Sequence, residues 1–127
     1  MNKISKTILI LVIALTTGCY YDNEEKLYAE VSTTCDLTNV TFAVTVKPIL
    51  QASCYTCHSN SEVSKGNGGG VKLENYADVK TSVNSGKLMG TVKHLSGFQQ
   101  MPQGGGKLSD CEISQLQKWI DNGTLNN

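Results

Sequence analysis

Hydrophobic positions recur at helical intervals most clearly near the end of the chain. Ile113, Leu116 and Ile120 are spaced so that they share one face of a helix. Just before this pattern, Ser109 and Glu112 have the spacing of a capping box, in which each side chain bonds a backbone N–H of the other residue. The sequence therefore predicts a final helix that begins directly after Ser109.

Weaker patterns predict three shorter helices upstream. The first covers about residues 45–53, with Pro48 in its first turn, where proline is tolerated. The second begins after the potential cap Asn75 and ends near Gly86, and the third covers about residues 87–95. The alternation of polar and apolar residues that is typical of strands is not persuasive anywhere in the chain.

Two long segments between these helices predict loops. Residues 59–70 are rich in Ser, Asn and Gly, and residues 97–106 contain Pro102 and three consecutive glycines, a composition that opposes helix. We therefore expect an all-α fold with few helices and long loops. Aromatic residues make up only 6% of the chain, so large core side chains are scarce and we expect a bound group to complete the core.

The N-terminus has the features of an export signal. Lys3 and Lys6 precede an apolar run over residues 7–15, which is shorter than the ~20 residues of a membrane span but typical of a secretory signal. Residues 15–19 resemble the lipobox of bacterial lipoproteins, in which the cysteine, here Cys19, is acylated. The alternative is ordinary signal cleavage with an incidental Cys19.

These features divide the chain into three parts. We expect a signal peptide over residues 1–18, a tether over residues 19–34 and one folded domain over residues 35–127. The tether contains an acidic stretch similar to the surface-export tethers of Bacteroidetes lipoproteins, although a plain linker has the same composition. The prediction is a lipoprotein held on a lipid bilayer outside the cytoplasm. It would face the periplasm or the cell surface, with the outer membrane as the expected location, and disulfides form in that environment.

The charge of the chain argues against a nucleic-acid partner. The 11 basic and 11 acidic side chains give a formal net charge of +0. Loss of Lys3 and Lys6 with the signal peptide leaves the exported protein weakly acidic. Phosphate backbones are bound by strongly basic surfaces, so we expect no nucleic-acid binding.

The candidate chemistry lies in the sequence Cys54-Tyr55-Thr56-Cys57-His58. Cys-X-X-Cys-His is the attachment motif of c-type haem, because one helical turn brings both thiols to the haem vinyl groups and the next residue supplies an axial nitrogen. Three other interpretations compete: a thioredoxin-type dithiol, a zinc site, and a disulfide between Cys54 and Cys57. The dithiol lacks a preceding strand, and Cys35 and Cys111 are too far apart to form the usual second ligand pair for zinc. Haem attachment is therefore favoured.

A haem that only carries electrons needs a second axial ligand. Met101 is the favoured candidate, because it lies in a loop beyond the motif and Pro102 restricts it to an extended backbone. His94 is the alternative distal ligand. Its other possible roles are a surface position or a hydrogen bond to a haem propionate.

Residues 35–127 resemble a single-haem cytochrome c domain of the kind common in exported Bacteroidetes and Planctomycetes proteins. The resemblance rests on residues 44–50, on the motif at 54–58, on Met101-Pro102, on Leu108-Ser109 and on residues 119–123. It implies an all-α cytochrome c fold around one covalent haem c. The first and last helices are then packed across one another, with Trp119 near that crossing or near the haem.

The resemblance also implies roles for individual residues. Carried over by position, Cys54 and Cys57 are the thioether sites, His58 is the proximal ligand and Met101 is the distal ligand.

Cys35 and Cys111 flank the domain, one before the first helix and one at the start of the last. Because the resemblance implies that these helices touch, we expect a disulfide between them, and two free buried thiols are the alternative. A bond that closes so long a loop is expected to stabilise the fold strongly.

The expected function is electron transfer. With both axial positions assigned, no iron site remains open for a substrate, so we expect an electron carrier that acts with redox partner proteins rather than an enzyme. The alternative is an anchored accessory or binding module of a larger oxidoreductase or polysaccharide-handling complex, in which the haem is mainly structural.

Overall fold

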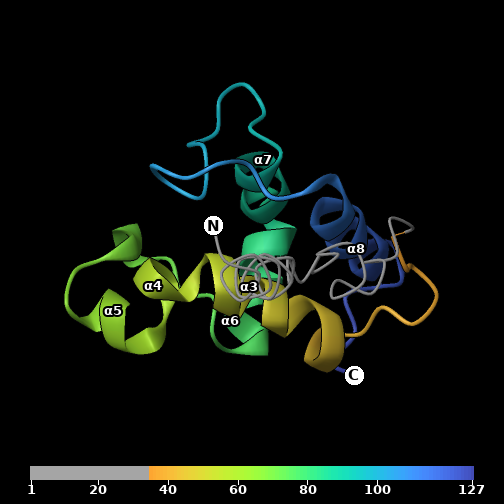
Figure 1. The fold of residues 1–127 in the computed structure, drawn as a ribbon. Coiled ribbons are helices and arrows are strands. Elements are labelled where there is room, and N and C mark those ends of the chain that lie inside the picture. Colours follow the sequence, from red (N-terminus) through yellow and green to blue (C-terminus); the bar gives the residue numbers. More distant parts are fainter. Residues whose placement is uncertain (1–34) are drawn as a thin grey trace, which may run out of the picture. The chain divides into compact units, whose positions relative to one another are not determined.

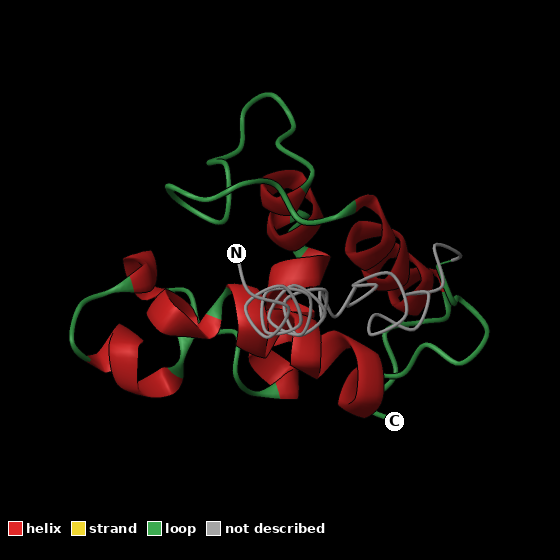
Figure 2. Ribbon diagram, in the orientation of Figure 1, coloured by secondary structure: helices red, strands yellow, loops and turns green. Residues whose placement is uncertain are grey.

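The computed structural model describes residues 35–127. The predicted signal peptide, the lipidation of Cys19 and the tether lie outside these residues. Within residues 35–127 the structure contains helices, turns and loops and no strands (Figure 2). The predicted all-α fold with long loops is confirmed for this part of the chain.

The helices are short and follow one another closely in the first half of the domain (Figure 1). In chain order they are the π-helix η1 (Phe42–Val46), α3 (Lys47–Ser53), α4 (Tyr55–His58), α5 (Asn60–Ser64), the 3-10 helix η2 (Gly68–Gly70), α6 (Tyr76–Asn84), α7 (Lys87–Val92) and α8 (Asp110–Asp121). Among these helices, none is long and apolar enough to cross a membrane.

The final helix α8 begins where the sequence predicts. The Ser109 hydroxyl accepts a hydrogen bond from the Glu112 N–H at 3.2 Å, and the Glu112 carboxylate accepts one from the Ser109 N–H at 2.8 Å. This capping box satisfies N–H groups that a helix start leaves unpaired. The buried face of α8 consists of Ile113, Leu116 and Trp119.

The three upstream helices are present with shifted bounds. The helical region predicted over residues 45–53 begins earlier, because the Thr41 hydroxyl caps η1 by accepting from the Val44 N–H at 3.2 Å. Asn75 precedes α6 as predicted, but its side chain makes no cap bond. Helix α7 ends at Val92 rather than near residue 95, because the chain turns into the left-handed region at His94, where φ is 57°.

The prediction of a continuous loop over residues 59–70 is wrong. This segment contains α5 and η2. Helix α5 is capped by the Ser59 hydroxyl, which accepts from the Glu62 N–H at 3.3 Å. The cap compensates for the weak helix propensity of a Ser- and Asn-rich segment.

The core lies where η1, α3, α6, α7 and α8 meet. Trp119 is only 1% exposed, its ring lies 5.6 Å from that of Phe42, and its indole N–H donates to the Leu125 carbonyl at 2.8 Å. The Phe42 ring meets Tyr76 edge-on at 5.3 Å. Helices η1 and α8 therefore pack together around an aromatic cluster. The full set of buried apolar residues is Val40, Phe42, Val46, Ile49, Leu50, Leu73, Val79, Leu88, Val92, Leu108, Ile113, Leu116 and Trp119.

A disulfide links the start of the domain to α8. The sulfur atoms of Cys35 and Cys111 are 2.09 Å apart and their Cα atoms 5.3 Å apart, with a sequence separation of 76. This is the pair that the sequence led us to expect, and all the helices before α8 lie within the closed loop.

Candidate functional site

The Cys-X-X-Cys-His motif forms one helical turn around α4. The N–H groups of Cys57 and His58 both donate to the Cys54 carbonyl, at 3.1 and 2.9 Å. Both motif cysteines are free thiols, with Cys54 half-buried and Cys57 exposed. The structure therefore contains no disulfide between Cys54 and Cys57.

The two thiols differ in their surroundings. Burial, with a smaller contribution from the negative charge of Glu112, raises the pKa of the Cys54 thiol to about 11. Desolvation disfavours the thiolate form of a cysteine. In the haem-free chain Cys54 is therefore protonated at neutral pH.

The His58 ring is held in one orientation. Its Nδ1 lies 2.9 Å from the carbonyl oxygen of Val71. A carbonyl only accepts hydrogen bonds, so in the neutral ring Nδ1 carries the proton and the lone pair lies on Nε2. A hydrogen bond of this kind fixes the tautomer and raises the basicity of a metal-binding histidine. The structure therefore leaves Nε2 of His58 available as a ligand.

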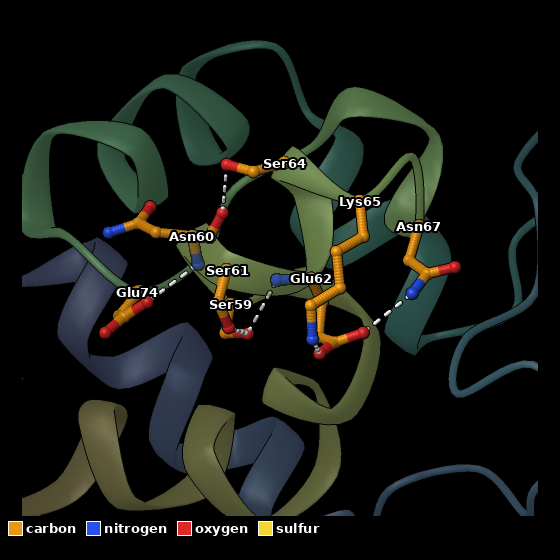
Figure 3. A network of polar contacts seen from close by, with 8 residues as sticks. All are labelled: Ser59, Asn60, Ser61, Glu62, Ser64, Lys65, Asn67 and Glu74. Atoms are coloured by element: carbon orange, nitrogen blue, oxygen red, sulfur yellow. Dashed lines mark hydrogen bonds and ion pairs between the residues drawn. The ribbon is translucent and has the colours of Figure 1, made fainter.

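A short segment, residues 71–74, holds the motif from one side. Besides the bond from His58 to Val71, the Leu73 N–H donates to the His58 carbonyl at 2.9 Å. The Tyr55 hydroxyl donates to the Glu74 carbonyl at 3.3 Å. The Asn60 N–H donates to the Glu74 carboxylate at 2.7 Å (Figure 3). The 71–74 segment therefore contacts both ends of α4.

Gly68 packs directly against the motif. A Cβ atom at this position would lie 2.5 Å from the Cys57 carbonyl oxygen and 2.8 Å from Nδ1 of His58. The φ angle of Gly68 is +63°, in the left-handed region that favours glycine. Both the conformation and the close approach require a residue without a side chain.

Glu62 organises the turn that leads from α5 to Gly68. Its carboxylate accepts from the Lys65 ammonium and from the Asn67 amide, each at 2.7 Å (Figure 3). These two hydrogen bonds hold the pKa of Glu62 below its usual value, and the bond from Lys65 has the larger effect. The network fixes the path of residues 62–67 just before Gly68 packs against the motif.

Met101 and His94, the two candidate distal ligands, contact each other. Nε2 of His94 lies 3.0 Å from the Met101 carbonyl oxygen. The Met101 N–H donates to the Thr91 carbonyl at 3.2 Å. Among residues 35–127, no hydrogen bond joins this pair to the Cys-X-X-Cys-His turn. The hydrogen bonds of the structure therefore do not connect the two halves of the predicted site.

The thiols and His58 fit covalent haem attachment. Both cysteines are unpaired, they lie on one turn, and the following histidine presents Nε2 while Nδ1 is bonded elsewhere. Haem iron takes four ligands from the porphyrin, so the protein needs to supply only one or two. By contrast, no group of three His, Cys, Asp or Glu side chains within the described domain is arranged to hold a metal ion by itself.

The contacts from Val71 and Gly68 were not predicted from the sequence. Val71 acts through its backbone carbonyl, which every residue carries, so its side chain gives no signal. Gly68 lies in a run of glycines within the segment that was predicted to be a loop. A glycine run soon after the motif is the only indication that a close backbone approach was needed.

Comparison with known proteins assigns no family to the chain. The chain matches no protein-family model, no curated protein and no solved structure. The residues of the site are therefore the basis for a functional proposal.

Proposed function

We propose that this protein is a c-type cytochrome, which transfers single electrons through one covalently bound haem outside the cytoplasm. The observation that supports this most directly is the hydrogen bond from Nδ1 of His58 to the Val71 carbonyl at 2.9 Å. This bond leaves the Nε2 nitrogen free to bind iron. His58 directly follows two free thiols on the same helical turn.

Each residue of the site has one task in this proposal. The thiols of Cys54 and Cys57 form the two thioether links, and His58 supplies the proximal nitrogen. Met101 supplies a thioether as the distal ligand. When bound, haem c supplies a one-electron iron couple, and the protein sets its potential through these ligands and excludes water.

The proposal includes a membrane-anchored location and redox partner proteins. Cys19 would carry the lipid, and the tether would separate the domain from the bilayer. The disulfide between Cys35 and Cys111 supports export, because such bonds persist in oxidising compartments and are rare in the cytosol.

Covalent haem attachment is the first test. The full chain is produced in a bacterium with haem-maturation machinery, and haem is stained after denaturing electrophoresis and identified by its pyridine spectrum. We expect covalent haem in the wild type and none in the variant with Cys54→Ser and Cys57→Ser. The matched control carries Cys35→Ser and Cys111→Ser, which removes two other cysteines and should retain the stain. A wild type without covalent haem would refute the proposal.

A second test separates electron transfer from a structural haem. We expect a low-spin spectrum, a reversible one-electron titration and rapid exchange with a soluble electron acceptor. Met101→Ala should convert the haem to a high-spin form that binds carbon monoxide, whereas Met89→Ala, which removes a thioether packed against the core, should not. Slow exchange in a low-spin wild type would favour an accessory module over a carrier.

A further inference from the structure

The C-terminal end of α7 places a histidine where helices usually have glycine. The Leu95 N–H donates to the Gly90 carbonyl at 3.0 Å, and the His94 N–H donates to the Thr91 carbonyl at 3.2 Å. These two bonds form a Schellman motif, whose left-handed residue is commonly Gly. Here that residue is His94, with φ of 57°. A side chain in this conformation is strained, and a favourable contact elsewhere can compensate for that strain.

The compensating contact is the backbone of Met101. Nε2 of His94 lies 3.0 Å from the Met101 carbonyl oxygen and must be the donor, because the carbonyl can only accept. The Met101 N–H bonds the Thr91 carbonyl at 3.2 Å. Both polar groups of the Met101 backbone are therefore bonded to the end of α7.

The loop that leads to Met101 is also packed onto α7. The Phe98 ring lies against Gly90, since a Cβ atom on Gly90 would come within 2.5 Å of that ring. The Phe98 N–H donates to the Leu95 carbonyl at 3.2 Å. Figure 1 shows a long irregular segment between α7 and α8. The first part of this segment contacts α7 at two residues, Phe98 and Met101.

We propose that His94 is a positioning residue that fixes the backbone of Met101, and that it is not itself the distal ligand. This inference rests on the proposed function, in which the Met101 thioether binds iron. With its backbone bonded at both polar groups, Met101 loses less conformational freedom when its side chain binds the metal. His94 therefore favours thioether ligation over competing ligands from solution.

Two substitutions separate the hydrogen bond from the backbone conformation. His94→Gly suits the left-handed conformation better than histidine but has no donor. His94→Asn also tolerates this conformation, and its shorter side chain does not reach as far as Nε2. If the ring donor matters, both variants should behave alike, even though the glycine removes strain.

The measurements are made on the mature full-length protein. Hydrogen exchange of the Met101 amide should accelerate about three- to tenfold in both variants, as expected for the loss of one net hydrogen bond. Binding of added imidazole to the oxidised, haem-loaded protein should tighten by about the same factor, because the Met101 thioether competes less well. Wild-type protein should bind imidazole most weakly and the Met101→Ala variant most tightly, so these two set the limits for the His94 variants.

Three results would overturn the inference. Unchanged Met101 amide exchange and imidazole binding in both variants would show that the contact between His94 and the Met101 carbonyl is unimportant. A change in the glycine variant alone would indicate that greater backbone flexibility is the cause. Loss of the low-spin spectrum with unchanged Met101 amide exchange would identify His94 as the ligand. Absence of covalent haem in the wild type would refute the proposed function, and amide exchange would still test whether His94 holds Met101.

Discussion

Replacing Gly68 by alanine tests whether close packing on His58 shapes the site. The new methyl group would lie 2.5 Å from the Cys57 carbonyl oxygen and 2.8 Å from Nδ1 of His58. The nearer atom belongs to the backbone of α4 and cannot rotate away. To make room, the His58 ring and the 71–74 segment would have to shift together, because they are hydrogen-bonded to each other.

Two costs add in this variant. Alanine in the left-handed conformation costs about 1–2 kcal/mol relative to glycine. Forcing an extra methyl group into a packed site typically costs about 1–3 kcal/mol more. The expected loss of about 2–5 kcal/mol is large compared with the roughly 5–15 kcal/mol that stabilises an ordinary domain.

The neighbouring glycine provides the matched control. Gly69 has a similar φ of +57°, but a Cβ atom there meets nothing within 4 Å. Gly69→Ala should therefore show only the conformational cost. The free energy of unfolding in guanidinium and the yield of covalent haem are measured for both variants. Equal losses in the two would refute the idea that Gly68 is needed for contact with His58, while a greater loss at Gly68 in both measurements is expected.

Four other predictions concern the rest of the described domain. Replacing both Cys35 and Cys111 by serine should lower the free energy of unfolding by about 2–4 kcal/mol, and an unchanged denaturation midpoint would contradict this. In the chain made without haem, an alkylating reagent should modify Cys57 before Cys54 at about pH 8, because the Cys54 thiol is buried; equal rates would argue against that burial. Burial raises the pKa of Cys54 from 9.0 to about 11, so the folded chain binds the thiol proton more tightly than the unfolded chain does. The free energy of unfolding of the haem-free chain should therefore fall as pH rises from about 9 to about 11. Ser109→Ala should cost about 1 kcal/mol of unfolding free energy through the lost cap of α8, and an unaffected stability would show that the cap contributes nothing.

The final helix could be predicted from the sequence because its signals are local. Ser109 and Glu112 lie three positions apart and bond each other, and the buried residues of α8 recur at the helical period. No distant contact is needed to recognise such an element. The helical turn of the Cys-X-X-Cys-His motif could be predicted for the same reason, because the spacing of its residues already indicates one helical turn.

Helix α5 was missed although it carries a similar signal. Ser59 and Glu62 have the same spacing as Ser109 and Glu112, and the Ser59 hydroxyl does cap the helix. However, the Glu62 carboxylate bonds Lys65 and Asn67 instead of returning to Ser59. The prediction followed the high Ser, Asn and Gly content of the segment and took no account of the Ser59–Glu62 spacing.

The contacts that orient the candidate ligands could not be predicted, since they are tertiary and involve backbone groups. The acceptor for His58 is the carbonyl of Val71, 13 residues later, and the acceptor for His94 is the carbonyl of Met101. From the sequence, His94 was a rival ligand, a surface residue or a propionate partner. A contact to the backbone of Met101 was not among these, because nothing in residue type or spacing indicates it.

The disulfide at the edge of the domain has a mechanical consequence. If the protein is tethered to a membrane through its N-terminus, tension enters the domain at Cys35. The covalent link passes that force to Cys111 in the first turn of α8, so it bypasses the intervening chain. The Cys-X-X-Cys-His turn, the 71–74 segment and Met101 all lie within the bypassed loop. A pull between the anchor and the C-terminus would therefore pass through α8 and bypass the chain that carries the proposed iron ligands.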